Sequence, residues 1–165
     1  MLEVSKIRIL EEAVRVVRAE LSAMTRAALA AHEAATHEES RSEDKHDTRG
    51  VEASYLAGAQ AERARILQET ADFLSGLSVR DFRPEETIQL GALVCWKNLE
   101  GPPRMFWGFL LPKGGGTCVS FGGDAVQILG GGSPLGDALL GLHAGDAFEI
   151  ETPRGAREYE VVAVR

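Results

Sequence analysis

Apolar residues recur at alternating spacings of three and four along the N-terminal part of the chain. The positions that follow this spacing are Ile7, Leu10, Val14, Val17, Leu21, Met24, Ala28 and Ala31. Because an α-helix has about 3.6 residues per turn, this spacing gathers all of them on one stripe of a long helix. A stripe of this kind is typical of a coiled-coil seam. The sequence therefore predicts a long helix that packs lengthwise against a second helix.

A second helix is predicted from about residue 49 or 50 to residue 77. Its matching face is predicted to consist of Leu56, Ala59, Ile66, Thr70, Phe73 and Leu77. A chain that runs out along one helix and returns along the other forms an antiparallel hairpin. Each arm would reach about 45 Å at 1.5 Å per residue. We therefore expect residues 1–80 to form a coiled-coil hairpin with residues 37–47 at its far tip.

The character of the sequence changes near residue 80. Up to that point there is no proline and glycine is rare, whereas both residues are frequent afterwards and short apolar runs replace the helical spacing. Such runs, separated by glycine- and proline-rich turns, are typical of β-strands. Ser133 and Pro134 can begin one short helix among the strands. We predict an α+β protein whose residues 83–165 form a β-rich, mainly antiparallel domain with one helix, joined semi-independently to the hairpin.

Charge and composition exclude several classes of function. The net charge of −7 argues against broad electrostatic attraction to nucleic acid or to an anionic membrane, because such binding needs a basic face. No segment approaches the roughly 18 consecutive apolar residues of a membrane span, and the N-terminus lacks a secretory signal, so we expect a cytoplasmic protein. Cys95 and Cys118 have no spacing typical of a zinc site or a disulfide framework, which favours reduced thiols.

The C-terminal segment from Ser133 to Val164 resembles the signature of the bacterial GreA/GreB transcript-cleavage and elongation factors. The residues in step with that signature are Ser133, Pro134, Leu139, Gly141, Gly145, Asp146, Thr152, Pro153, Gly155 and the final alternating strand. The resemblance extends over the whole chain, since that family has an N-terminal antiparallel coiled coil and a C-terminal FKBP-like domain. It implies a monomer that docks on RNA polymerase through Ser133, Pro134, Leu135 and Leu139, without a membrane partner.

The predicted hairpin tip is rich in carboxylates. Asp44 and Asp47 have the three-residue spacing of the family's acidic pair, and Glu43 lies beside them. The segment that follows is about one helical turn longer than the family pattern, so either Asp44 with Asp47 or Glu43 with Asp47 could match that pair. Hard carboxylate oxygens suit Mg²⁺, although an acidic turn is also common on a merely solvated tip.

The resemblance implies a function that is exerted inside RNA polymerase. The hairpin would enter the secondary channel, and its tip would stimulate the polymerase's own Mg²⁺-dependent cleavage of backtracked nascent RNA. The protein itself would then be an activator and not an enzyme, with no stably bound cofactor, and its contact with the RNA 3′ end and the DNA would be indirect. One alternative is a factor that occupies the same channel but inhibits or modulates transcription. A more distant alternative is a coiled-coil and FKBP-like adaptor without a polymerase partner.

Overall fold

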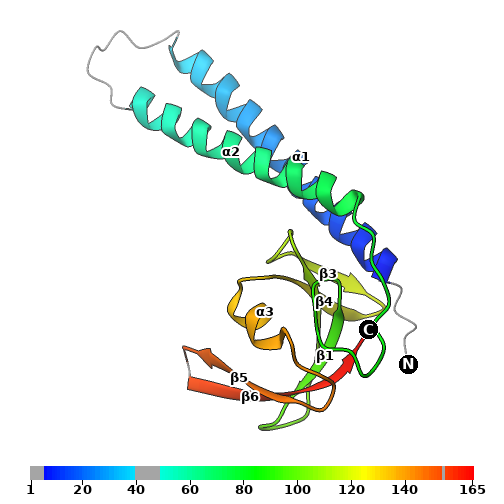
Figure 1. Ribbon diagram of the computed structural model, residues 1–165. Helices are drawn as coiled ribbons and strands as arrows, with labels where there is room; N and C mark the ends of the chain where they lie inside the picture. The colour runs from blue at the N-terminus through cyan, green and yellow to red at the C-terminus, as the bar shows by residue number, and fades with distance from the viewer. Residues whose placement is uncertain (1–5, 40–48, 154) are drawn as a thin grey trace.

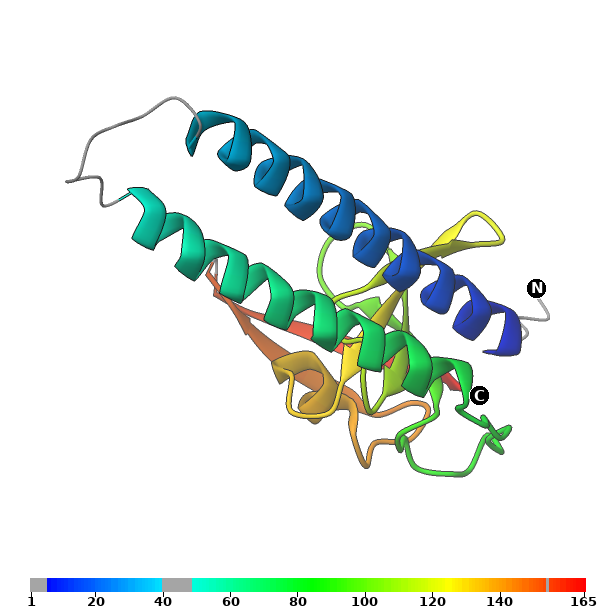
Figure 2. The same ribbon diagram turned by 90° about the horizontal axis from the view of Figure 1, so that it is seen from above.

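The computed structural model describes residues 6–39, 49–153 and 155–165, and for residues 34–39 and 49–56 it describes the backbone alone. Two long helices, α1 (Lys6–Glu39) and α2 (Arg49–Ser75), run antiparallel and project together from a β-sheet (Figure 1). Figure 2 shows the two helices side by side along their length. The predicted hairpin is confirmed, and α2 ends close to its predicted end. Among the described residues, no helix combines the length and apolar character that crossing a membrane requires.

The remaining chain forms a single six-stranded sheet in the order β3-β4-β2-β1-β6-β5. Its elements are β1 (Leu93–Asn98), β2 (Met105–Leu111), β3 (Cys118–Phe121), β4 (Asp124–Gly130), α3 (Pro134–Leu139), β5 (Ala147–Thr152) and β6 (Gly155–Val164). The β2–β4 pair is parallel and the other four pairs are antiparallel. The predicted α+β class, with a mainly antiparallel sheet and one short helix, is confirmed.

Both faces of the sheet are covered. Successive side chains of a strand point to opposite faces, so Phe109 and Leu111 of β2 face one side while Leu110 faces the other. The first side packs against the root of the hairpin and the second against α3. This explains why the end of β2 is a continuous apolar run that is fully buried, instead of an alternating strand with one wet face.

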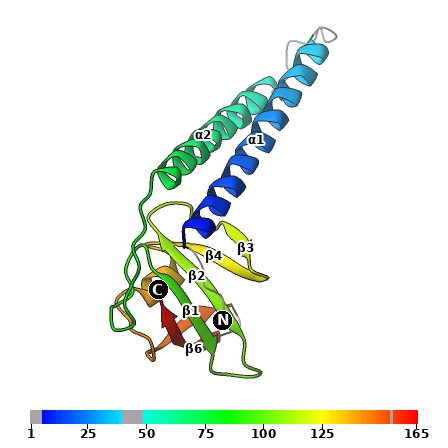
Figure 3. The ribbon, with the colours of Figure 1, turned by 90° about the vertical axis from the view of Figure 1, so that its right-hand side faces the viewer.

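The hairpin and the sheet share one hydrophobic cluster, which we call the root cluster. Its buried members are Ile9, Leu10, Ala13, Val14, Val17, Leu67, Ala71 and Leu74 from the helices and Leu93, Phe109, Leu111, Val119, Val126 and Ile128 from the strands. Figure 3 shows the two helices rising from the sheet at this root. Side chains of both parts fill this cluster, so we now expect the two parts to unfold together, although the sequence predicts that they fold semi-independently.

The inward face of α2 includes the predicted Thr70, and Leu77 just after the helix also packs inward, but the face otherwise differs from the predicted one. Ile66 and Phe73 are 49% and 38% exposed, whereas Leu67, Ala71 and Leu74 are buried. Two apolar stripes with helical spacing run along this helix, and spacing alone cannot choose between them. The root of α2 packs against α1 and the sheet at once, and this packing selects the stripe that contains Leu67, Ala71 and Leu74. On α1 the predicted stripe is confirmed from Leu10 to Met24, which packs against the root cluster. Its first predicted member, Ile7, is instead 60% exposed, and the neighbouring Ile9 is buried.

Candidate docking surface and hairpin

The start of α3 is built by local hydrogen bonds that the sequence Ser-Pro-Leu-Gly encodes. Ser133 is the N-cap: its Oγ accepts a hydrogen bond from the Gly136 amide at 3.1 Å and donates one to the Gly130 carbonyl at 2.8 Å. Pro134 occupies the first helical turn, where its missing N–H costs nothing. Asp137 closes the turn by accepting a hydrogen bond from the Gly132 amide at 2.8 Å. Ser133 therefore shapes this loop with both of its hydrogen-bonding functions.

Gly136 is required by a close approach of two main-chain segments. A Cβ atom at this position would lie 2.4 Å from the carbonyl oxygen of Gly130 and 2.8 Å from Ser133 Oγ. Atoms of a real side chain do not approach a backbone oxygen so closely, so only glycine lets α3 begin directly after β4. The glycine fixes where the exposed end of α3 is presented.

The four residues predicted to dock on a partner separate in the structure. Pro134 is exposed, and Ser133 and Leu135 are half-buried. Leu139 has no exposed surface and belongs to the cluster on the second face of the sheet. In this conformation Leu139 supports α3 from within and cannot itself touch a partner, because burial leaves no surface for contact.

Sequence reasoning missed two exposed leucines beside this loop. Leu90 is 47% exposed and Leu140 is 36% exposed. The linker residue Ile88 holds them near each other, because its amide donates to the Leu142 carbonyl at 2.8 Å and its carbonyl accepts from the Gly141 amide at 2.9 Å. We call Leu90, Pro134, Leu135 and Leu140 the docking surface. Leu90 stands in the apolar run that leads into β1, so its spacing gives no signal that it would be exposed.

The acidic residues of the predicted tip, Glu43, Asp44 and Asp47, lie outside the described residues. Within the ranges that the structure describes, no three histidine, cysteine, aspartate or glutamate side chains gather in a way that could hold a metal ion.

The two cysteines are free, Cys95 buried and Cys118 exposed. Burial raises the pKa of the Cys95 thiol to about 11, so this thiol remains protonated at neutral pH.

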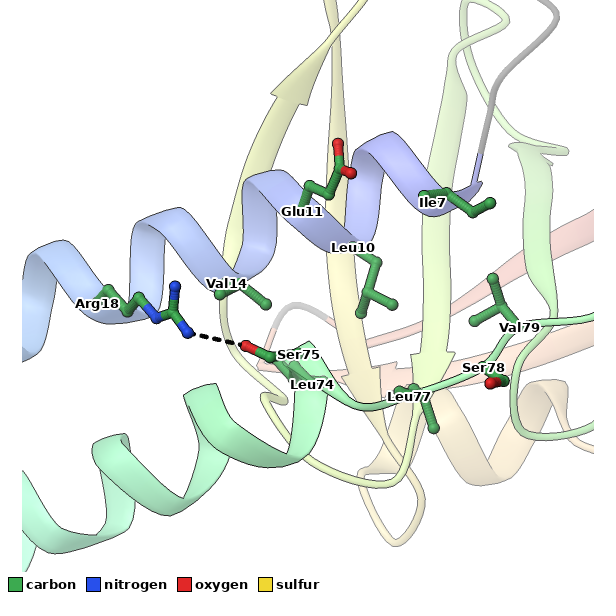
Figure 4. A pocket seen from close by; sticks show the side chains of 10 residues that line it. All are labelled: Ile7, Leu10, Glu11, Val14, Arg18, Leu74, Ser75, Leu77, Ser78 and Val79. Atoms are coloured by element: carbon green, nitrogen blue, oxygen red, sulfur yellow. Dashed lines mark hydrogen bonds between the residues drawn. The ribbon is translucent and has the colours of Figure 1, made fainter.

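A groove of about 640 Å³ lies at the root of the hairpin (Figure 4). It is lined by Ile7, Leu10, Glu11, Val14, Arg18, Leu74, Ser75, Leu77, Ser78 and Val79. Most of these side chains are apolar, and the hydrogen bond at its rim, from Arg18 to Ser75 Oγ at 3.1 Å, joins α1 to the end of α2. The lining contains no nucleophile paired with a base, so the groove does not have the arrangement of a catalytic site.

Comparison with known proteins connects both halves of the molecule to one group. The family model described as transcription elongation factor, GreA/GreB, C-term, matches residues 126–165. Transcription inhibitor protein Gfh1 of Thermus thermophilus is 31% identical over 126 residues, which cover 74% of this chain and 74% of that protein. Transcription elongation factor GreA of Neisseria meningitidis is 30% identical over 89 residues, covering 52% of this chain and 49% of that protein.

One solved structure matches this chain over most of the length of both proteins. The crystal structure of Thermus aquaticus Gfh1 is 23% identical, and the match covers 94% of this chain and 95% of that one with a TM-score of 0.41. The named relatives thus include both transcription elongation factors and a transcription inhibitor.

Proposed function

Because the chain belongs to the GreA/GreB family of transcription factors, we propose that it binds RNA polymerase and inserts its hairpin into the secondary channel of that enzyme. The C-terminal domain would dock at the channel entrance through the docking surface. The hairpin tip would then reach towards the polymerase active site. The adaptor alternative without a polymerase partner is set aside, because it does not follow from the family.

The observation that carries this proposal is the division of the molecule into an anchored root and a projecting arm. The last fully buried residue of α1 in the root cluster is Val17. At 1.5 Å per residue, residues 18–39 of α1 extend about 33 Å beyond that point. A narrow arm of this length suits a deep channel, while the exposed apolar residues beside α3 suit a contact at its rim. Reach is thus supplied by the hairpin and anchoring by the C-terminal domain.

At the tip, we propose that Asp44 and Asp47, supported by Glu43, help to hold a Mg²⁺ ion of the polymerase. One such ion can activate water while another steadies the leaving oxygen during hydrolysis of a phosphodiester. Two or three carboxylates on an exposed turn bind Mg²⁺ weakly by themselves, so the free protein should have no nuclease activity. In this proposal the chain stimulates cleavage of backtracked RNA by the polymerase and is not itself an enzyme.

A second candidate function is inhibition of transcription from the same position. It is favoured by the similarity to Gfh1, a protein named as a transcription inhibitor, over 126 residues, compared with 89 residues for the GreA of Neisseria meningitidis. The tip segment, about one turn longer than the family pattern, is the part that could convert a cleaving arrangement into a blocking one. The two functions share the binding site and differ only in what the tip does there.

Stalled, backtracked elongation complexes separate the two functions. The full-length protein is added with Mg²⁺, and both RNA shortening and RNA extension are followed. If it stimulates cleavage, Asp44→Asn and Asp47→Asn should each reduce the cleavage rate by about tenfold or more, or about 1.4 kcal/mol of transition-state stabilisation, without weakening binding. Glu11→Gln, which removes an equal charge at the hairpin root, is the matched control and should stimulate cleavage as strongly as the parent.

The same assay contains the results that would contradict each function. Equal stimulation of cleavage by the parent and both asparagine variants would exclude a role of these carboxylates in the cleavage reaction. Binding with no RNA shortening and with slower extension would assign the inhibitory function. Absence of binding to polymerase, measured by competition with a labelled copy of the protein, would reject the proposal as a whole.

A further inference from the structure

A buried lysine begins the first helix. The side chain of Lys6 is 5% exposed. Its Nζ atom donates hydrogen bonds to the carbonyl oxygens of Arg80 and of Gly91, the latter at 3.0 Å. The same ammonium lies 4.7 Å from the centroid of the Phe82 ring. Lysine is rarely buried, because removing an ammonium from water is costly unless its donors are satisfied.

Burial disfavours the charged form of Lys6. Desolvation is the main effect and lowers the pKa of Lys6, while the nearby carboxylate of Asp81 acts in the opposite direction. The hydrogen-bond acceptors that the described residues offer to Nζ are main-chain carbonyls. An apolar side chain of similar length would fill the same space without this cost. The lysine is therefore better explained by the directional hydrogen bonds that it donates than by a gain in the stability of the fold.

All three contacts of Lys6 lie in the linker between α2 and β1. Arg80 lies five residues after the end of α2, and Gly91 lies two residues before β1. Gly91 is itself held to β2, because its amide donates to the Leu110 carbonyl at 2.7 Å. Phe82 belongs to the cluster on the second face of the sheet, and the guanidinium of Arg80 covers its ring at 3.8 Å. One ammonium thus joins the start of α1 to the linker, and the linker is itself held to β2 and to the cluster on the second face of the sheet.

We propose that Lys6 is a positioning residue that fixes the angle at which the hairpin leaves the sheet. The root cluster holds α1 and α2 against the sheet by apolar contacts, which are not directional and permit small changes of angle. Hydrogen bonds depend on direction, and those of Lys6 act at the opposite end of α1 from the tip. Over a helix of about 50 Å, a tilt of about 10° at the root would displace the far end by about 9 Å.

This inference rests on the proposed function only for its consequence in the polymerase. A tip that must meet one metal ion tolerates a displacement of that size poorly, because a misplacement of about 1 Å can already cost a hundredfold in rate. The docking surface is formed by other residues, so Lys6 should affect what the tip does once bound and not whether the protein binds. The angle itself can be measured without polymerase.

The direct test measures the distance between the hairpin and the sheet in the full-length protein. Spin labels are placed on cysteines introduced at Leu29 of α1 and Leu99 of the β1–β2 loop, which are 59% and 44% exposed. Cys118→Ser removes the exposed natural thiol, and Cys95 is buried. Pulsed electron paramagnetic resonance then gives the distribution of distances between the two spin labels.

The decisive variants are Lys6→Met, which keeps the length of the side chain but has no donor, and Val14→Ala, which weakens the root cluster without touching the hydrogen bonds of Lys6. We expect Lys6→Met to widen the distance distribution at least twofold or to shift its centre, and Val14→Ala to leave both unchanged. If Lys6→Met does not fold, Lys6→Leu, which also has no donor, is measured instead with the same expectation of a widened distribution.

Two results would overturn the inference. An unchanged distribution in the folded lysine variant would show that the apolar contacts alone set the angle. Equal widening in Val14→Ala would show that any loss of stability at the root has this effect. In the polymerase assay, the lysine variant should bind like the parent but have at least a threefold smaller effect at saturation. A parent without any effect on polymerase would reject the proposed function and leave the distance test valid.

Discussion

Gly136 offers the sharpest test of how the loop before α3 is built. In Gly136→Ala, the new methyl group would lie 2.4 Å from the Gly130 carbonyl oxygen and 2.8 Å from Ser133 Oγ. The serine could rotate away only by giving up the hydrogen bonds that cap α3, and the carbonyl belongs to the end of β4. Overpacking of this kind costs about 1 to 3 kcal/mol. We expect a loss of about 2 kcal/mol in the free energy of unfolding, which lowers the Tm by about 4 to 8 °C.

A matched glycine exists in α2, where the same change should have the opposite sign. A Cβ atom at Gly58 would meet nothing within 4 Å, and the residue lies inside a helix. Alanine is a better helix former than glycine by about 1 kcal/mol, so Gly58→Ala should raise stability by up to that amount. The pair of variants separates the effect of a close approach from the general effect of replacing glycine.

Urea unfolding of the full-length protein, followed by circular dichroism, measures both changes. Competition for polymerase measures the docking surface at the same time, and Gly136→Ala should weaken binding at least threefold because it displaces Pro134 and Leu135. A Gly136→Ala protein as stable as the parent would refute the reasoning, since the close approach to Gly130 would then not exist. A destabilised Gly58→Ala protein would show that α2 is not an exposed helix at that point.

Three further predictions concern the core, the thiols and the docking surface. Phe109→Ala should lower the free energy of unfolding by about 3 to 5 kcal/mol. Helical circular dichroism and tryptophan fluorescence should still report one common unfolding transition, because the hairpin and the sheet share the root cluster. Two separated transitions would contradict this expectation. With a thiol reagent at pH 8, Cys118 should react in the native protein and Cys95 only in urea, because the pKa of about 11 keeps the buried thiol protonated; rapid reaction of both thiols would show that β1 opens. Leu90→Ser should weaken polymerase binding without a loss of stability. The control is Leu99→Ser in the β1–β2 loop, where the leucine is 44% exposed, and this variant should bind polymerase like the parent. Equal affinities of the two variants would remove Leu90 from the docking surface.

Patterns that depend on neighbours in the chain could be predicted from the sequence. The seam of α1 follows from apolar spacing, since one turn of helix places residues three and four apart on the same side. The capped start of α3 follows from Ser133 and Pro134, because the bonds that make it are local. The strands and turns of the second half follow in the same way from alternation and glycine. These features suffice for the α+β class and for the resemblance to the Gre factors.

Contacts between distant segments were decided by the tertiary structure alone. The buried face of α2, the burial of Leu139 and the exposure of Leu90 all depend on which surfaces meet, and a one-dimensional pattern gives each helix more than one suitable face. The burial of Lys6 was invisible for the same reason. Its acceptors are the carbonyls of Arg80 and Gly91, far along the chain, and a carbonyl oxygen is present in every residue whatever its side chain. Only folding brings these oxygens to the one place where the lysine can reach both.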